Sequence, residues 1–372
     1  MQEPIRVLNL FTIMNRGGAE TMVMNYYRHM DRSRVQFDFL VHREERGAYE
    51  DEIEALGGRI YRMPPVRPWT AHSYRKAIRH FFAEHPEYRI LHAHMSELGL
   101  YAFQVAKQMD IPVRICHAHN CPHGIDLKSP VRWYMKTLMR PYITHHFMCG
   151  QESGEWLFGK KYANEFVQMN NAIDSTAFVY DPARRREVRQ ALSLPEDVSV
   201  VGHVGRFNKQ KNHPFLIDVF SAYLDLEPNA VLLLVGNGSG MQTIQRKAEK
   251  LGIADKVCFL GSRGDVPDLM QAMDVFVFPS LFEGLGIALV EAEASGLPCV
   301  VSNVIPPESY VTDLVFPLKL TDAPMKWAEV IQNKMNRCRA DTSQQIAAHG
   351  FDIRSEACKL QQFYLEAYEQ NK

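Results

Sequence analysis

The chain has 372 residues, of which 46% are hydrophobic and 23% charged, with a formal net charge of −1. This length allows two domains of ordinary size, and the balanced charge excludes a broad nucleic-acid surface. We expect a cytoplasmic protein without a signal peptide, because Met1-Gln2-Glu3-Pro4 leads directly into a predicted strand. We expect no disulfide framework, because the seven cysteines are odd in number and form no C-x-x-C pair. No apolar run reaches the roughly 18 residues of a membrane span.

Strand and helix patterns alternate through the first half of the chain. Apolar runs predict strands at Ile5–Phe11, Val35–His42, Ile90–Ala93 and Val113–His119. Helical periodicity predicts helices after Gly17 and at Tyr49–Leu56, Tyr74–Glu84 and Gly99–Met109. Such alternation is typical of a parallel sheet with helices on both faces.

The alternation is interrupted at Asn170–Pro195 and then resumes. Strands are predicted at Val200–Val204, Ala230–Val235, Val257–Leu260 and Asp274–Phe278, with helices near Pro214–Leu224 and at Met241–Leu251. We therefore expect two doubly wound α/β domains, at residues 1–172 and 173–354, followed by a helix over Ser355–Tyr368. Ligands of such sheets bind outside the carboxyl ends of the strands.

The strand that ends at Phe278 leads into the most informative loop. Two glycines follow Glu283, and an apolar helix containing Glu291 then ends at Gly296. Carboxylates are rarely buried without a partner, and eight residues of helical rise separate these two by roughly 12 Å at most. A nucleotide sugar can span that distance. The backbone N–H groups of Gly284-Leu285-Gly286, at the start of the helix, can face its sugar or phosphates.

A second loop supplies cations. Arg206 and Lys211 follow the predicted strand Val200–Val204, where a diphosphate would lie. Arginine can bind two phosphate oxygens at once, and lysine supplies a mobile charge. Negative charge grows on a diphosphate leaving group as the glycosidic bond breaks, so both cations would stabilise the transition state more than the ground state. The alternative is a solvated basic loop.

These two loops resemble the E-x7-E and G-R-x4-K motifs of the retaining glycosyltransferase family GT4, which has the GT-B fold. The resemblance implies two Rossmann-like domains facing a central cleft, with the last helix packed back on the first domain. It also implies that the first domain binds the acceptor and the second the nucleotide-sugar donor. Glu283 would hold the donor sugar, Glu291 the ribose, and Arg206 and Lys211 the diphosphate.

The resemblance extends to three weaker loops. Gly17 and Gly18 match a G-G-x-E loop near the donor phosphate and the acceptor. Gly236 and Gly238 match a G-x-G that precedes a helix, and Arg263 lies in the loop that borders the nucleotide base. Each of these loops could also be an ordinary turn without a ligand.

Histidines cluster around the predicted strand Val113–His119. The family has a histidine at the end of this strand, near the donor sugar, and its usual place here falls between His117 and His119. We expect His119 because it is nearer the strand end. Residues 116–123 contain enough histidine and cysteine for zinc, but the spacing fits no common zinc pattern, so we expect no metal site. His92 and His94 are either acceptor contacts or core histidines.

No D-x-D pair occurs in the chain, so we expect the two cations to replace the divalent ion that such a pair holds on a diphosphate. No cofactor or metal is required on this interpretation. The resemblance implies a retaining transfer from a nucleotide sugar, with a UDP-sugar preferred, to a glycan or lipid-linked precursor of exopolysaccharide or capsule. The alternatives are a nucleotide-sugar epimerase of the same fold and a non-catalytic nucleotide-sugar-binding protein.

The segment Val131–His146 is predicted to form a helix that Pro141 shortens. Arg132, Lys136 and Arg140, at four-residue spacing, would form a basic stripe beside aromatic and apolar residues. Such a surface could rest on anionic lipid at the inner face of the cell membrane. The alternative is a core-packed helix with a solvated basic edge.

Overall fold

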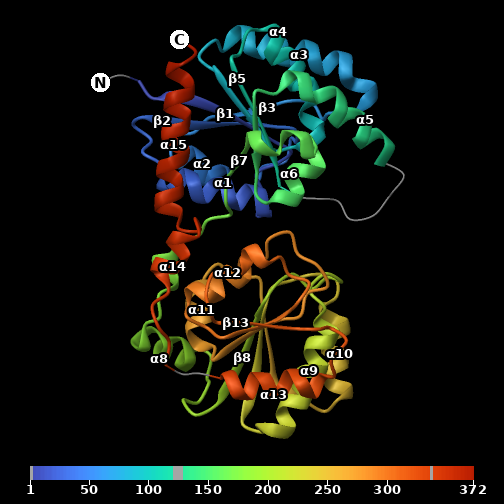
Figure 1. The fold of residues 1–372 in the computed structure, drawn as a ribbon, viewed down its shortest axis with the longest axis vertical. Helices are drawn as coiled ribbons and strands as arrows, with labels where there is room; N and C mark the ends of the chain where they lie inside the picture. Colours follow the sequence, from blue (N-terminus) through green and yellow to red (C-terminus); the bar gives the residue numbers. More distant parts are fainter. Residues whose placement is uncertain (1–2, 120–128, 336–337) are drawn as a thin grey trace. The chain divides into compact units, whose positions relative to one another are not determined.

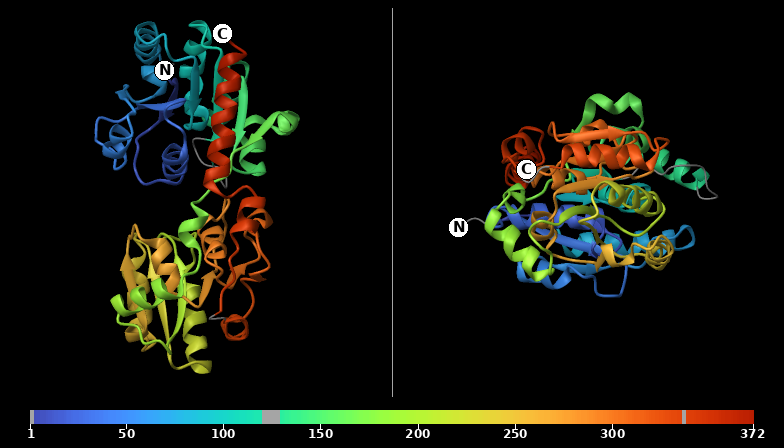
Figure 2. Two further views of the ribbon diagram at one scale, coloured as in Figure 1. Left: turned by 90° about the vertical axis from the view of Figure 1, so that its left-hand side faces the viewer. Right: turned by 90° about the horizontal axis from the view of Figure 1, so that it is seen from below.

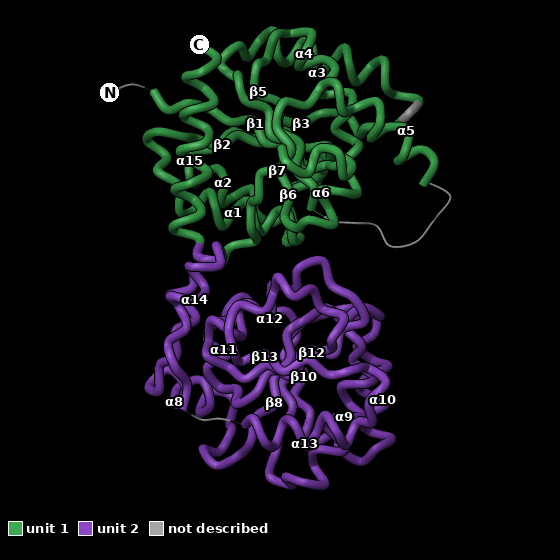
Figure 3. The backbone as a smooth tube through the Cα atoms, in the orientation of Figure 1, with its two compact units in different colours: residues 1–172, 353–372 green, residues 173–352 purple. Residues whose placement is uncertain are grey.

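The computed structural model describes residues 3–119, 129–335 and 338–372, which fold as two compact units (Figure 3). Unit 1 contains the chain up to residue 172 and residues 353–372, and unit 2 contains residues 173–352. Each unit is a parallel β-sheet with helices on both faces (Figure 1). The α/β fold predicted from the alternation of strands and helices is confirmed.

The sheet of unit 1 has, in the described residues, seven parallel strands in the order β3-β2-β1-β4-β5-β6-β7. Its strands are β1 (Ile5–Phe11), β2 (Val35–Val41), β3 (Ile60–Arg62), β4 (Ile90–Ala93), β5 (Val113–Ala118), β6 (His145–Met148) and β7 (Phe166–Gln168). Its α-helices are α1 (Gly18–His29), α2 (Glu50–Ala55), α3 (Ala71–Glu84), α4 (Leu100–Gln108), α5 (Ser129–Met139), α6 (Gln151–Phe158) and α15 (Ile353–Glu369). The strand order reverses between β1 and β4, and ligands of such sheets bind at that point.

Apolar layers cover both faces of this sheet. Successive residues of β1 show the alternation, because Val7 packs with α1 and α15 while Leu8 packs with α3 and α4. Helix α15 lies against α1 and β2, and Figures 1 and 2 show this red helix alongside the unit 1 sheet. It is held there by buried Ile353, Leu360 and Tyr364, so the end of the chain completes the core of the first unit.

The sheet of unit 2 has, within the described part of the chain, six parallel strands in the order β10-β9-β8-β11-β12-β13. Its strands are β8 (Ser199–Val204), β9 (Ala230–Val235), β10 (Val257–Gly261), β11 (Val275–Phe278), β12 (Cys299–Ser302) and β13 (Val315–Leu318). Its α-helices are α7 (Ser175–Phe178), α8 (Pro182–Ala191), α9 (His213–Leu226), α10 (Met241–Lys250), α11 (Val266–Ala272), α12 (Ile287–Ala294), α13 (Pro324–Lys334) and α14 (Ser343–Ala348). The order reverses between β8 and β11, so the loops after these two strands border the expected binding point.

Strand β11 is apolar throughout because both of its faces are buried, as is usual in a parallel sheet. Val275 and Val277 pack with α9, α10 and α13, while Phe276 and Phe278 pack with α11 and α12. All four side chains are fully buried. The strand is therefore fixed on both sides, and the loop that follows it starts from a rigid base.

The predicted helix at Val131–His146 is wrong in its second half. Helix α5 ends at Met139, a short 3-10 turn spans Arg140–Tyr142, and His145 begins strand β6. Pro141 lacks the N–H group that would continue an α-helix, which accounts for the break. No helix among the described residues is long and apolar enough to cross a membrane.

Candidate active site

The candidate site is built at the carboxyl edge of the unit 2 sheet, where the strand order reverses. The loop after β8 holds residues 205–212, and the loop after β11 holds residues 279–286. The Leu281 N–H group donates to the Gln210 carbonyl at 2.8 Å and joins the two loops. This connection brings together Lys211 and Glu283, which come from two separate sequence motifs.

Lys211 and Glu283 form an ion pair that is largely removed from water. Lys211 Nζ donates to Glu283 Oε1 at 2.7 Å, and Gln210 Nε2 donates to Glu283 Oε2 at 3.1 Å. Lys211 Nζ also lies 4.4 Å from the centre of the Phe278 ring. The two charged side chains are only 15% and 6% exposed. Removing both charges from water is costly, so a buried ion pair of this kind contributes little to stability. It therefore marks a candidate functional site.

Glu291 lies in α12 and has no hydrogen-bond partner for its carboxylate among the described residues. The side chain keeps partial exposure, but burial raises its pKa to about 7, and only the attraction of nearby Lys211 opposes this rise. A carboxylate without a protein partner can accept hydrogen bonds from the hydroxyl groups of a ligand. Both predicted acids therefore lie near the same lysine.

We expect Glu291→Gln to raise the melting temperature at pH 8 and leave it almost unchanged at pH 5. The pKa of this carboxyl rises from 4.5 to about 7 on folding, so the folded chain binds more protons between these values and stability falls as pH rises through that window. Above pH 7, where Glu291 is ionised in the folded chain, the free energy of unfolding is lower by on the order of 3 kcal/mol. Thermal melts at both pH values measure the change. Equal shifts at pH 5 and pH 8 would contradict this account of Glu291.

Arg206 is exposed in the β8 loop, and its guanidinium has no partner among the described residues. The loop is fixed by close backbone contact with residues 236–240, where the Phe207 N–H group donates to the Asn237 carbonyl at 3.0 Å. A Cβ atom on Gly236 would lie 2.1 Å from a carbonyl oxygen of the β8 loop, and one on Gly238 would lie 2.6 Å from another. These glycines permit the contact, and their binding to a donor stays a prediction.

The start of α12 places backbone groups at the same edge. Gly286 precedes the helix with a φ of 77°, a conformation that favours glycine. Gly284 has open space around its Cα atom, so a ligand can approach the backbone there. The Leu285 carbonyl accepts a hydrogen bond from Ser309 Oγ, which anchors the loop. First-turn N–H groups carry partial positive charge and suit an anionic ligand.

In unit 1, Gly17 caps α1 and Gly18 begins it. The Glu20 carboxylate folds back over Gly17, and a Cβ atom at that position would collide with it. A carboxylate in the first turn is favourable beside a helix N-terminus. The Glu20 carboxylate therefore lies beside the start of α1, and ligand contact by Gly17 and Gly18 stays a prediction.

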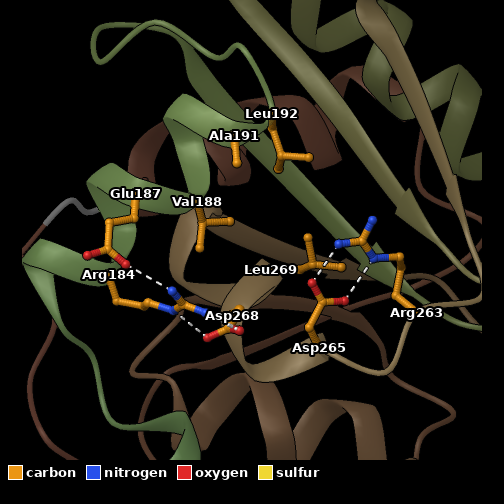
Figure 4. A pocket seen from close by; sticks show the side chains of 9 residues that line it. All are labelled: Arg184, Glu187, Val188, Ala191, Leu192, Arg263, Asp265, Asp268 and Leu269. Atoms are coloured by element: carbon orange, nitrogen blue, oxygen red, sulfur yellow. Dashed lines mark hydrogen bonds and ion pairs between the residues drawn. The ribbon is translucent and has the colours of Figure 1, made fainter.

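Arg263 lines a separate pocket of about 320 Å³ between α8 and α11 (Figure 4). Its guanidinium pairs with Asp265 at 2.6 Å, and the other arginine of this pocket, Arg184, pairs with Asp268 at 2.6 Å. Both positive charges are paired with neighbouring carboxylates, and the pocket lies apart from the loops that follow β8 and β11. Contact of Arg263, or of the backbone of its loop, with the nucleotide base stays a prediction.

His119 is held at the carboxyl edge of the unit 1 sheet by both of its ring nitrogens. Its Nε2 lies 2.9 Å from His94 Nδ1, and His94 Nε2 lies 3.3 Å from Asn9 Oδ1. Its Nδ1 lies 3.3 Å from Cys149 Sγ. A sugar could contact the His119 ring nitrogens only by displacing one of these partners, so the predicted catalytic role of His119 stays a prediction.

His117 contacts Cys149 as His119 does. We call His92, His94, His117, His119 and Cys149 together the histidine cluster. Its Nε2 lies 3.3 Å from Cys149 Sγ, and its Nδ1 lies 3.3 Å from His92 Nε2. His92 Nδ1 in turn lies 2.7 Å from the Tyr364 hydroxyl. Burial lowers the pKa of all four histidines, that of His119 to about 3, and raises the pKa of the Cys149 thiol to about 12. The cluster is therefore uncharged at neutral pH.

Sequence reasoning missed Gln210 and Cys149. Gln210 could have been found, because it is a polar residue directly before Lys211 in the predicted diphosphate loop. No such signal pointed to Cys149, because the strand that precedes it was partly predicted as helix. Cys121 and His123, which the sequence offered as further zinc ligands, lie outside the described residues.

The basic residues of α5 are partly engaged with the fold, which corrects the predicted free basic stripe. Lys136 Nζ donates to the Trp156 carbonyl at 2.6 Å and lies over its ring, and Arg132 Nε lies 3.6 Å from a Glu97 oxygen. The large side chains that this helix leaves exposed are apolar or aromatic. They are Val131 at 49%, Trp133 at 65%, Tyr134 at 59% and Leu138 at 39% exposure, which together we call the α5 apolar face.

Two protein-family models match the chain. The model described as "Glycosyl transferase 4-like domain" matches residues 17–149, in unit 1. The model described as "Glycosyl transferases group 1" matches residues 184–336, in unit 2. The second match includes the β8 loop, the β11 loop and helix α12.

Similar proteins cover most of the chain. The putative glycosyltransferase EpsF of Bacillus subtilis is 36% identical over 332 residues, which are 88% of this chain and 86% of EpsF. The UDP-Gal:alpha-D-GlcNAc-diphosphoundecaprenol alpha-1,3-galactosyltransferase of Escherichia coli is 28% identical over 59% of this chain and 58% of its own. The crystal structure of Anabaena HepE in complex with UDP-glucose shares the fold, with a TM-score of 0.73 at 19% identity over 98% of this chain and 99% of that one.

Proposed function

The chain belongs to the GT4 family of group 1 glycosyltransferases, and from this we propose that it moves a sugar from a UDP-sugar to a lipid-linked glycan during polysaccharide biosynthesis. Family membership makes the chain a retaining glycosyltransferase rather than an epimerase or a binding protein. The observation that carries the proposal is the 2.7 Å contact of Lys211 with Glu283 at the point where the unit 2 strand order reverses.

The donor is proposed to lie along the carboxyl edge of unit 2. Lys211 and exposed Arg206 would neutralise its diphosphate, and Glu283 would accept hydrogen bonds from the donor sugar. Glu291, whose carboxylate has no partner among the described residues, would accept hydrogen bonds from the ribose hydroxyls. Charge that develops on the leaving diphosphate would then meet cations already in place, which is the most effective form of electrostatic catalysis. The names of both the Escherichia coli relative and the HepE complex contain a UDP-sugar, which favours a uridine donor.

We assign acceptor binding to unit 1. This assignment rests on the family resemblance, and it leaves His119 and the Gly17-Gly18 turn as proposed contacts with donor or acceptor. The proposed contact of His119 is with a sugar and not with the nucleotide. Substitutions of His119 should therefore affect transfer without affecting the affinity for UDP.

A titration of the whole chain with nucleotide sugars tests the donor proposal. We expect UDP-glucose to bind more tightly than GDP-glucose or ADP-glucose in calorimetry and to raise the melting temperature accordingly. Affinity for UDP should be unchanged by EDTA, because protein cations and not a divalent ion are proposed to neutralise the diphosphate. Loss of UDP binding on chelation, restored by added magnesium, would overturn the metal-free diphosphate site.

The lipid-linked acceptor is supported by the α5 apolar face. Aromatic and apolar side chains on one short helix are suited to the interfacial region of a bilayer, where tryptophan and tyrosine are enriched. The name of the Escherichia coli relative also gives a lipid-linked acceptor. We propose that this face rests in the membrane interface and that the partly paired cations of α5 add a weaker attraction to anionic lipid.

We expect the chain to sediment with anionic vesicles and the double variant Trp133→Ser/Leu138→Ser to remain in the supernatant. High salt should release only part of the wild-type chain, because salt screens the charges but not the apolar contact. Leu251→Ser is the matched control, since Leu251 is 43% exposed in unit 2. Sedimentation of the double variant at the wild-type level would remove the membrane proposal, while UDP-glucose hydrolysis should be unchanged in all variants.

A further inference from the structure

We propose that His117, His119 and Cys149 form a binding site for one divalent ion of the zinc class inside unit 1. Cys149 Sγ lies 3.3 Å from His117 Nε2 and 3.3 Å from His119 Nδ1, and all three atoms lie within 4.8 Å of one another. In a tetrahedral site with bonds of about 2.0 Å to nitrogen and 2.3 Å to sulfur, neighbouring ligand atoms are about 3.3 to 3.6 Å apart. The two sulfur–nitrogen distances are thus close to ligand spacing already. The His117 and His119 rings are stacked, with centroids 4.1 Å and planes 17° apart, so one ring must turn before both nitrogens point at the ion.

The fold explains why these residues meet. His117 and His119 are two residues apart at the end of β5 and therefore point to the same side. Cys149 directly follows β6, whose register places Met148 beside Ala118 of β5, so the next residue lies beside His119. Imidazole and thiolate are the ligands that zinc prefers, and the set contains both.

Each proposed histidine ligand is oriented by another histidine. His119 Nε2 lies 2.9 Å from His94 Nδ1, and His117 Nδ1 lies 3.3 Å from His92 Nε2. Partners of this kind fix the tautomer and ring orientation of metal-binding histidines, and their loss weakens metal affinity by about 10- to 100-fold. Sites with three protein ligands take water as the fourth ligand.

The hydrogen bonds also define where the protons lie before an ion binds. Asn9 Oδ1 can only accept, so His94 Nε2 donates to it and His94 Nδ1 accepts from His119 Nε2. The Cys149 thiol has two acceptors, His119 Nδ1 and Met22 Sδ, which lies 3.6 Å from it, and its sulfur accepts from His117 Nε2. Without an ion, the cluster is a hydrogen-bonded chain with a defined direction.

Binding of the ion needs two changes of proton position. The Cys149 S–H bond breaks as the sulfur–metal bond forms, and its proton leaves to solvent. His117 carries its proton on Nδ1 instead of Nε2 and donates it to His92. His119 keeps its proton on Nε2, and its Nδ1 lone pair turns from the thiol to the ion. Both of its ring nitrogens are then occupied, so the proposed sugar contact of His119 applies to the protein without the ion. The thiolate offsets one of the two charges of the ion, which limits the cost of holding it inside the protein.

Titration of the whole chain with Co²⁺, and with Zn²⁺ in competition, tests the site. We expect the wild type to bind one equivalent of Co²⁺ with a sulfur-to-cobalt charge-transfer band that Zn²⁺ abolishes. Cys149→Ala should lose the band and at least about 100-fold in Zn²⁺ affinity, more than removal of an orienting partner costs. Cys116→Ala is the matched control, because Cys116 is buried on the same strand and packs in the layer on the opposite face of the sheet.

Two outcomes would overturn the proposal. One is a charge-transfer band that persists in Cys149→Ala, and the other is the absence of stoichiometric Co²⁺ binding by a folded wild type. Should Cys149→Ala fail to fold, His117→Gln gives a second test, with the same loss of band expected. Zn²⁺ should raise the melting temperature of the wild type but not of Cys149→Ala, and UDP affinity should be the same in both because the site belongs to unit 1.

Discussion

Lys211→Ala is expected to lower kcat for sugar transfer by about 10²- to 10³-fold, which is the usual cost of removing one preorganised group that stabilises transition-state charge. In the free protein, Glu283 and the Phe278 ring hold Lys211 at the sheet edge where the diphosphate is proposed to lie. Steady-state rates with a saturating donor measure the effect. Arg206→Ala should lower the same rate, and Lys209→Ala should not, because Lys209 is an exposed lysine of the same loop.

The stability effect of this substitution must be separated from its catalytic effect. Removing Lys211 leaves Glu283 buried without its counter-ion, and breaking a buried pair from one side costs about 3 to 5 kcal/mol. The double variant Lys211→Met/Glu283→Gln should recover most of that stability but none of the activity. A double variant that regains both would show that Lys211 acts only by keeping the fold intact.

Glu283→Gln is expected to lower transfer by about 10²-fold or more while UDP affinity stays equal or becomes tighter. The proposed contact of this acid is with the donor sugar, so UDP alone does not use it. Its removal also leaves Lys211 free to bind phosphate. Glu308→Gln is the control, because Glu308 is an exposed acid of the same unit. Equal losses of transfer and of UDP affinity in Glu283→Gln would reject the assignment.

Glu291→Ala, unlike Glu283→Gln, should lower the affinity for UDP. The proposed partner of Glu291 is the ribose, which UDP and UDP-sugars share, so affinity for both should fall together. Calorimetry with UDP and with UDP-glucose compares the two losses directly. A variant that binds UDP as the wild type does would place Glu291 away from the nucleotide.

The core of the candidate site was predictable because it depends on two regularities of the sequence. Apolar runs that end at Val204 and Phe278 are followed by loops rich in glycine and charge, and parallel sheets bring such loops to one edge. The pattern did not reveal that Lys211 and Glu283 pair with each other in the free protein. That contact depends on which two strands are neighbours, and strand order is not visible in periodicity.

Other features depended on contacts between distant segments and could not be predicted. Strand β6 is only four residues long, and the regular spacing of Arg132, Lys136 and Arg140 favoured a helix that continued into it. Cys149 therefore stayed unconnected to the histidines of β5. The pairing of Arg263 with Asp265 is local and could have been predicted from opposite charges two residues apart, and it would have weakened the case for Arg263 as a ligand contact.

Hydrogen–deuterium exchange of the full chain, with and without UDP-glucose, tests the central claim most directly. The claim is that the donor binds at the carboxyl ends of β8 and β11 and not in the pocket between α8 and α11. We predict slower exchange in peptides that cover residues 205–212 and 282–291, with no change in peptides that cover residues 184–192 and 266–272. Protection of the pocket between α8 and α11, with unchanged exchange in the β8 and β11 loops, would contradict the account.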